Sequence, residues 1–165
     1  MELITLLQKE LEQEAVTTYK MLSRVPSEKF NWQPHPKSMT LKRLACHVAE
    51  FPEWVNAIVT TGGIDFQETP YVPKEVKDTE ELIGFFEESL VKGREALANA
   101  NINTFTDQWI LCSGDQIYST DTKYEMIRMV HSQIIHHRAQ LGVYLRLLDI
   151  PIPGSYGPSA DDMSL

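Results

Sequence analysis

Four segments of the sequence repeat apolar residues at steps of three and four, and each is long enough for several helical turns. Because an α-helix turns once in about 3.6 residues, this spacing gathers the apolar side chains on one stripe that must be buried. Four such stripes in one chain predict an all-α fold, an antiparallel four-helix bundle with long crossover connections. The segments cover about residues 4–22, 40–60, 78–97 and 122–148.

The residues at the ends of these segments support the same assignment. Thr122 and Glu125 have the spacing of a capping box at the start of the fourth segment. Gly62-Gly63 ends the second segment, and Pro151 follows the fourth. Pro52 lies inside the second segment, where its missing N–H removes a backbone hydrogen bond, so we expect a bend there.

The connection between the third and fourth segments has a different character. It spans residues 101–121 and contains two short runs typical of strands, residues 108–111 and 116–118. Between them lies Ser113-Gly114-Asp115, a sequence typical of turns. This pattern predicts a short hairpin in an otherwise helical fold.

Length, charge and cysteine content exclude several classes of protein. A chain of 165 residues predicts a single domain over residues 1–165. Its formal net charge of -8 repels phosphate, so we expect no nucleic-acid partner. No apolar run approaches the roughly 18–20 residues of a membrane-spanning helix, so we also expect no membrane partner. Two cysteines and no visible secretory segment predict a cytoplasmic protein with reduced thiols.

Two histidines stand in the middle of apolar stripes. His47 belongs to the second segment and His137 to the fourth, whereas His35 lies between prolines in a loop. A single histidine on such a stripe is more often a hydrogen-bonded core residue than a ligand. Two on facing stripes favour a metal site, because bundles build such sites from side chains that point inward. Imidazole suits divalent zinc, nickel, iron and copper.

The spacing of ligands on the fourth segment adds a constraint. A helix offers two ligands most readily at positions i and i+4, which lie about 40° apart around its axis. The residue four before His137 is Gln133, whose amide oxygen is an uncommon ligand for a transition metal. His131 and His136 lie about 120° and about 100° away from His137, so either replaces Gln133 only if the helix rotates or bulges locally.

Three stretches of the chain resemble the DinB superfamily, four-helix-bundle proteins that include metal-dependent enzymes and bacillithiol-type transferases. The resemblance spans about residues 1–162 and is carried by residues 34–50, 136–146 and 152–161. It implies a divalent metal ion held by three histidines, one from the second helix and an i, i+4 pair from the fourth. His47 and His137 match two of these positions, and Gln133 stands at the third. The alternatives are a site of two histidines and a glutamine, a weakened site, or none.

The resemblance favours a cytoplasmic metal-dependent enzyme that transfers a low-molecular-weight thiol to an electrophilic small molecule. The cofactors would be a divalent ion (zinc, nickel or iron) and the thiol, with Arg138 or Arg146 pairing with a carboxylate of that thiol. One alternative is a non-catalytic small-molecule-binding or stress-associated protein with a degenerate metal site, and Gln133 supports it. Another is a metal-dependent hydrolase or isomerase on the same scaffold. We also expect a homodimer formed through helix faces, where Gly93 or Gly142 allows close approach.

Overall fold

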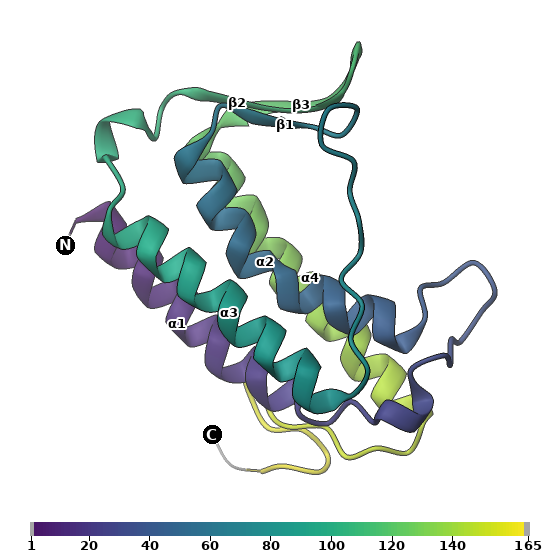
Figure 1. Ribbon diagram of the computed structural model, residues 1–165. Helices are drawn as coiled ribbons and strands as arrows, with labels where there is room; N and C mark the ends of the chain where they lie inside the picture. Colours follow the sequence, from purple (N-terminus) through teal and green to yellow (C-terminus); the bar gives the residue numbers. More distant parts are fainter. Residues whose placement is uncertain (1, 164–165) are drawn as a thin grey trace.

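Four long helices form the body of the protein, as the periodicity predicts. The computed structural model describes residues 2–163, and Figure 1 shows α1 beside α3 and α2 beside α4. Their apolar stripes meet in one continuous core, with Leu11, Leu44, Phe86 and Ile127 each at most 1% exposed. The helices are α1 (Leu3–Leu22), α2 (Leu41–Thr60), α3 (Thr79–Ala98) and α4 (Lys123–Leu147).

The directions of the helices depart from a simple antiparallel bundle. The connection from α2 to α3 runs back along the length of the bundle, so these two helices point the same way (Figure 1). Contacts between side chains agree: Glu10 pairs with Arg128 and Glu14 with Arg138, so α1 and α4 also run parallel. The antiparallel pairs are α1 with α3 and α2 with α4. One long crossover therefore changes the topology without changing which stripes are buried.

Local interactions define where the helices begin. Thr122 and Glu125 form the predicted capping box, each bonding to the backbone N–H of the other. The Asp78 side chain accepts a hydrogen bond from the N–H of Glu81 (2.9 Å) at the start of α3. These bonds satisfy N–H groups that have no partner inside a first helical turn.

Pro52 lies inside α2, and the neighbouring helix satisfies the backbone around it. The hydroxyl of Ser89, on α3, accepts from the N–H of Glu53 (2.8 Å) and donates to the carbonyl of Glu50 (3.1 Å). At Gly93 a β-carbon would lie 2.5 Å from the Pro52 carbonyl oxygen, so only glycine permits this close approach of α3 to α2.

A small sheet corrects the all-α prediction. The predicted hairpin is present as β2 (Gln108–Ser113) and β3 (Gln116–Thr122), with Gly114 at its turn in a left-handed conformation (φ 55°). A third strand, β1 (Gly63–Asp65), pairs with β2 in parallel, giving the order β1-β2-β3. The sheet covers one end of the bundle, next to the end of α2 and the start of α4 (Figure 1). The fold is therefore mostly helical rather than purely helical.

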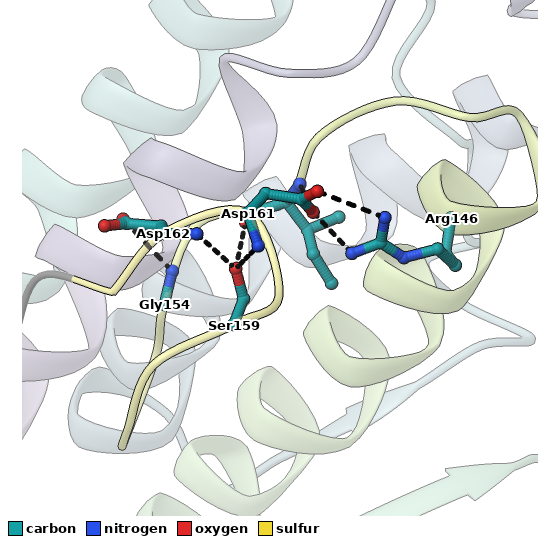
Figure 2. A network of polar contacts seen from close by, with 6 residues as sticks. Arg146, Gly154, Ser159, Asp161 and Asp162 are labelled. Atoms are coloured by element: carbon teal, nitrogen blue, oxygen red, sulfur yellow. Dashed lines mark hydrogen bonds and ion pairs between the residues drawn. The ribbon is translucent and has the colours of Figure 1, made fainter.

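The C-terminal segment closes the other end of the bundle through polar contacts (Figure 2). The Arg146 side chain pairs with the carboxylate of Asp161, which also accepts from the N–H of Ile152 (3.0 Å). Ser159 accepts from the N–H groups of Asp161 (3.1 Å) and Asp162 (3.0 Å). These bonds hold the segment after α4 as a defined loop.

Both glycines expected at a dimer interface are used inside the chain. Gly93 contacts α2, and a β-carbon at Gly142 would lie 3.5 Å from the methyl carbon of Met21 on α1. They give no separate support to the homodimer, which stays a prediction. Within residues 2–163, no helix is long and apolar enough to cross a membrane.

Candidate functional site

His47 and His137 meet where α2 packs against α4. Their ring centroids lie 4.7 Å apart, edge to face. Phe51, one turn after His47, stacks on the ring of His137 with a centroid separation of 5.6 Å and an interplanar angle of 14°. Phe51 is 4% exposed, so it places a buried apolar ring against the two partly exposed imidazoles. Burial lowers the pKa of His137, which favours the neutral, ligand-competent form of its ring.

Each of these imidazoles has its Nδ1 atom engaged by a neighbour on its own helix. Nδ1 of His47 contacts a carboxylate oxygen of Glu50, and Nδ1 of His137 lies 2.9 Å from the amide oxygen of Gln140. Because these oxygens only accept, both Nδ1 atoms carry a proton, and in the neutral rings both Nε2 atoms keep a free lone pair. Metal-binding histidines are commonly oriented by this type of outer hydrogen bond.

Glu50 is itself fixed by a residue from the crossover connection. The hydroxyl of Tyr71 lies 2.8 Å from both carboxylate oxygens of Glu50, which is 8% exposed. Burial, together with this hydrogen bond, raises the pKa of Tyr71, so its hydroxyl remains a donor. The chain Tyr71–Glu50–His47 therefore joins the crossover to α2 and fixes the orientation of the His47 ring.

Among the remaining candidate ligands on α4, His136 adjoins the pair, with its ring centroid 4.8 Å from that of His137 and the rings edge to face. His131 is 0% exposed and lies 3.5 Å from a carboxylate oxygen of Glu10 on α1, and burial lowers its pKa. The exposed His136 accepts at Nε2 from the amide of Gln140 (3.0 Å). Gln133 is half-buried, one helical turn before His137. Residues 2–163 contain no group of three or more His, Cys, Asp or Glu side chains that could hold a metal ion.

The donor set therefore fits a metal ion only in part. Two imidazole Nε2 atoms are available at His47 and His137, and both rings have the orienting partners that such ligands need. The third position of a three-histidine set falls on the amide of Gln133, a weaker donor for zinc, nickel or iron. To complete the coordination of a metal ion, water or an atom of a bound ligand would be needed in addition.

Arg138, predicted to bind the thiol, faces another part of the molecule. Its side chain is 2% exposed and pairs with the carboxylate of Glu14 at 2.7 Å. It also donates to Thr18 (3.1 Å) and to the hydroxyl of Tyr156 (2.8 Å). Arg146 likewise forms an ion pair with the carboxylate of Asp161 (Figure 2). Both arginines thus have internal carboxylate partners.

Sequence reasoning missed Arg43, the arginine that does adjoin the histidines. It lies on α2 exactly one i, i+4 step before His47, and that spacing was the signal that could have identified it. Its guanidinium carbon lies 5.1 Å from the centre of the Tyr71 ring, and its Nη1 atom is buried with no hydrogen-bond partner among the described residues.

Comparison with known proteins supports the fold and the family. The family model described as the DinB family matches residues 2–164. The chain belongs to the DinB family. No curated protein sequence matches it.

Solved structures of DinB-like proteins resemble this one closely in fold. A DinB-like protein from Bacillus subtilis has a TM-score of 0.67 and 14% identity, covering 88% of this chain and 95% of the other. One from Bacillus cereus ATCC 10987 has a TM-score of 0.67 and 17% identity, covering 91% and 95%. A DinB family member from Exiguobacterium sibiricum 255-15 has a TM-score of 0.66 and 21% identity, covering 90% and 93%. At these identities the likeness concerns the fold alone.

A similar fold also occurs within a longer chain. The crystal structure of a mycothiol-dependent maleylpyruvate isomerase has a TM-score of 0.61 and 14% identity to this chain. The match covers 86% of this chain but 61% of the isomerase, so the isomerase has further structure beyond the shared part.

Proposed function

We propose that this protein is a metal-dependent enzyme of DinB type that transfers a low-molecular-weight thiol to an electrophilic small molecule. One observation carries the proposal: His47 and His137 lie with ring centroids 4.7 Å apart, and neighbouring side chains engage both Nδ1 atoms. This leaves the Nε2 atoms of both rings as candidate donors on adjacent helices. The similarity in fold to a mycothiol-dependent enzyme adds support for a thiol as the second reactant.

The residues of the chain have distinct roles in this proposal. His47 and His137 would hold the ion, with Gln133 as a weaker third donor. A bound divalent ion supplies Lewis acidity, which deprotonates a coordinating thiol at neutral pH. Glu50 keeps the proton of His47 on Nδ1, and Tyr71 holds the Glu50 carboxylate in place. Phe51 excludes water from one side of the imidazole pair.

The chain's own cysteine next to His47 is not suited to act as the nucleophile. Cys46 is 1% exposed, and burial raises the pKa of its thiol to about 11. An external thiol is therefore the better candidate. In the transfer, its sulfur forms a bond to the electrophilic carbon, the leaving group departs with the bonding electrons, and the thiol proton passes to solvent.

Two measurements test this function. Untagged protein should contain roughly one zinc, nickel or iron ion per chain by elemental analysis, since a purification tag could load metal artificially. The metal-loaded protein should accelerate conjugation of a thiol such as N-acetylcysteine with 1-chloro-2,4-dinitrobenzene, releasing chloride. Chelated protein should lose this acceleration. Stoichiometric metal without any thiol-dependent turnover would instead favour a hydrolase or isomerase on the same scaffold.

A second candidate is a small-molecule-binding protein without a catalytic metal. Gln133 supports it, because an amide replaces the imidazole that the three-histidine pattern has at this position. The partly exposed imidazoles then act as hydrogen-bonding groups for a ligand, with Nε2 atoms as acceptors. A protein that binds no metal after incubation with zinc, nickel or iron would favour this candidate.

A further inference from the structure

Most arginines of the chain are paired with an acidic residue in the described structure, and Arg43 is not. The sequence has six arginines, and within residues 2–163 four of them form ion pairs with carboxylates. Arg24 is exposed in the turn after α1. Arg43 is half-buried and forms no ion pair among the described residues. The four pairs are Arg94–Glu12, Arg128–Glu10, Arg138–Glu14 and Arg146–Asp161.

The guanidinium of Arg43 lies against Tyr71, but its Nη1 atom lacks a hydrogen-bond acceptor among the described residues. The guanidinium carbon lies over the ring of Tyr71, 5.1 Å from the ring centre, and the Arg43 side chain is close enough to the Tyr71 hydroxyl to oppose the rise in its pKa. A cation–π contact provides no hydrogen-bond acceptor for Nη1. Nη1 is buried and has no partner within the described chain. A buried N–H donor without an acceptor costs free energy of folding. A ligand that supplied an acceptor to Nη1 would therefore bind favourably here.

Arg43 belongs to the same site as the two histidines. It precedes His47 by four residues on α2, so the two side chains lie on one face of the helix. Its stacking partner Tyr71 donates to Glu50, which contacts His47. Arg43 and Tyr71 are thus linked to the imidazole pair through Glu50 and His47.

We propose that Arg43 binds the carboxylate of the small-molecule ligand of this site, through the Nη1 group that has no partner among the described residues. The planar fork of arginine matches the two oxygens of a carboxylate. A singly charged group suits the local charge better than a phosphate, because Glu50 is close and Glu75 already pairs with the neighbouring cation Lys42. The substrate class is therefore a monocarboxylate. The inference rests on the proposed function only in taking the His47–His137 cluster as the ligand site.

Fluorine NMR titration with two matched probes tests this assignment without thiol or electrophile. The probes are 4-fluorobenzoate and its uncharged analogue 4-fluorobenzamide, added at millimolar concentration to protein treated with a chelator. We expect the wild-type protein to bind the acid at least about tenfold more tightly than the amide, equivalent to about 1.4 kcal/mol. Arg43→Gln should bring the two affinities within about twofold of each other.

Two further variants distinguish recognition by Arg43 from general charge or folding effects. Arg24→Gln removes the same charge from an exposed turn and should keep the wild-type preference for the acid. Arg43→Lys keeps the charge without the planar fork and should show an intermediate preference while preserving the fold by circular dichroism. No preference for the acid in the wild type, or an unchanged preference in Arg43→Gln, would overturn the proposal.

The same samples separate this inference from the proposed function. A protein that prefers the acid through Arg43, yet contains no metal and conjugates no thiol, has the carboxylate site but not the transferase activity. A protein with metal-dependent conjugation but no preference for the acid has the transferase activity without the carboxylate site.

Discussion

The imidazole rings of His47 and His137 lie edge to face, and each has its Nδ1 atom bound by an acceptor from its own helix. Two core histidines without a function could bond to each other and need no further partners. Here Glu50 and Gln140 accept hydrogen bonds from the Nδ1 atoms instead, which directs the Nε2 atoms away from these acceptors. Tyr71, from the crossover connection, then holds Glu50. The orientation of these rings is therefore set by residues that do not belong to the ligand set.

Replacing His47 by alanine should abolish metal binding and leave the helices intact. The change removes one of two imidazole donors, and the remaining amide and imidazole are too few for a stable site. The ring is half-buried on a long helix, where alanine has the highest helix propensity. Elemental analysis should therefore show metal at background level, with an unchanged far-ultraviolet circular dichroism spectrum. His35→Ala, in the exposed loop before α2, serves as the control and should retain metal. Equal metal content in both variants would contradict the assignment.

The thiol of Cys46 should make the protein less stable in alkali. Burial raises its pKa from 9.0 to about 11 in the folded state. An acid whose pKa is raised by folding has its full stability contribution below pH 9, and that contribution is lost as the pH rises toward 11. The free energy of unfolding in urea should therefore fall between these pH values, and by less in Cys46→Ala. An identical pH dependence of both proteins would show that Cys46 is not the group responsible.

The helices could be predicted from the sequence because each is encoded by its own periodic residues. Thr122 and Glu125 fix the start of α4 through neighbours three positions apart, a local pattern that needs no knowledge of the fold. Strand β1 could not be found in this way. Its three residues, Gly63–Asp65, have no alternating pattern, and they become a strand because the end of α2 brings them beside β2. The pairing is long-range, so it depends on the packed bundle.

The same distinction separates the site residues that were found from those that were missed. His47 and His137 stand on apolar stripes, so the bundle alone predicts that they face each other. Arg138 follows His137 directly, but one residue along a helix turns the side chain by about 100°, and Arg138 faces α1 instead. The importance of Arg43 depends on Tyr71, which the crossover connection brings to it. The i, i+4 spacing from Arg43 to His47 indicates a shared helix face, but no spacing within one segment reveals the contact with Tyr71.

Arg138→Met should be strongly destabilising, because it leaves the carboxylate of Glu14 without its buried cation. Glu14 is 7% exposed and Arg138 2%. Removing one partner of a buried pair typically costs about 3–5 kcal/mol of the free energy of unfolding. The double variant Glu14→Leu with Arg138→Met should recover much of this loss, since no unpaired charge remains. Arg94→Met, at a half-exposed pair with Glu12, should cost about 0–1 kcal/mol. Urea unfolding curves measure all three, and equal costs for Arg138→Met and Arg94→Met would refute the buried-charge argument.

Gln133→His should tighten metal binding, because it completes an i, i+4 pair of imidazoles with His137. Positions four apart lie about 40° apart on the helix and can address one ion together, and imidazole is a better donor than an amide for zinc, nickel or iron. Changes in outer hydrogen bonds alter metal affinity by about 10–100-fold, and a new direct ligand should have at least this effect. Competition with a chromophoric chelator measures the affinity. Ser132→His, at the exposed neighbouring position, adds the same imidazole in a different direction and should leave the affinity unchanged. If Gln133→His binds metal no more tightly than the wild type, Gln133 does not face the imidazole pair, and the ion site cannot include the α4 position that the three-histidine pattern requires.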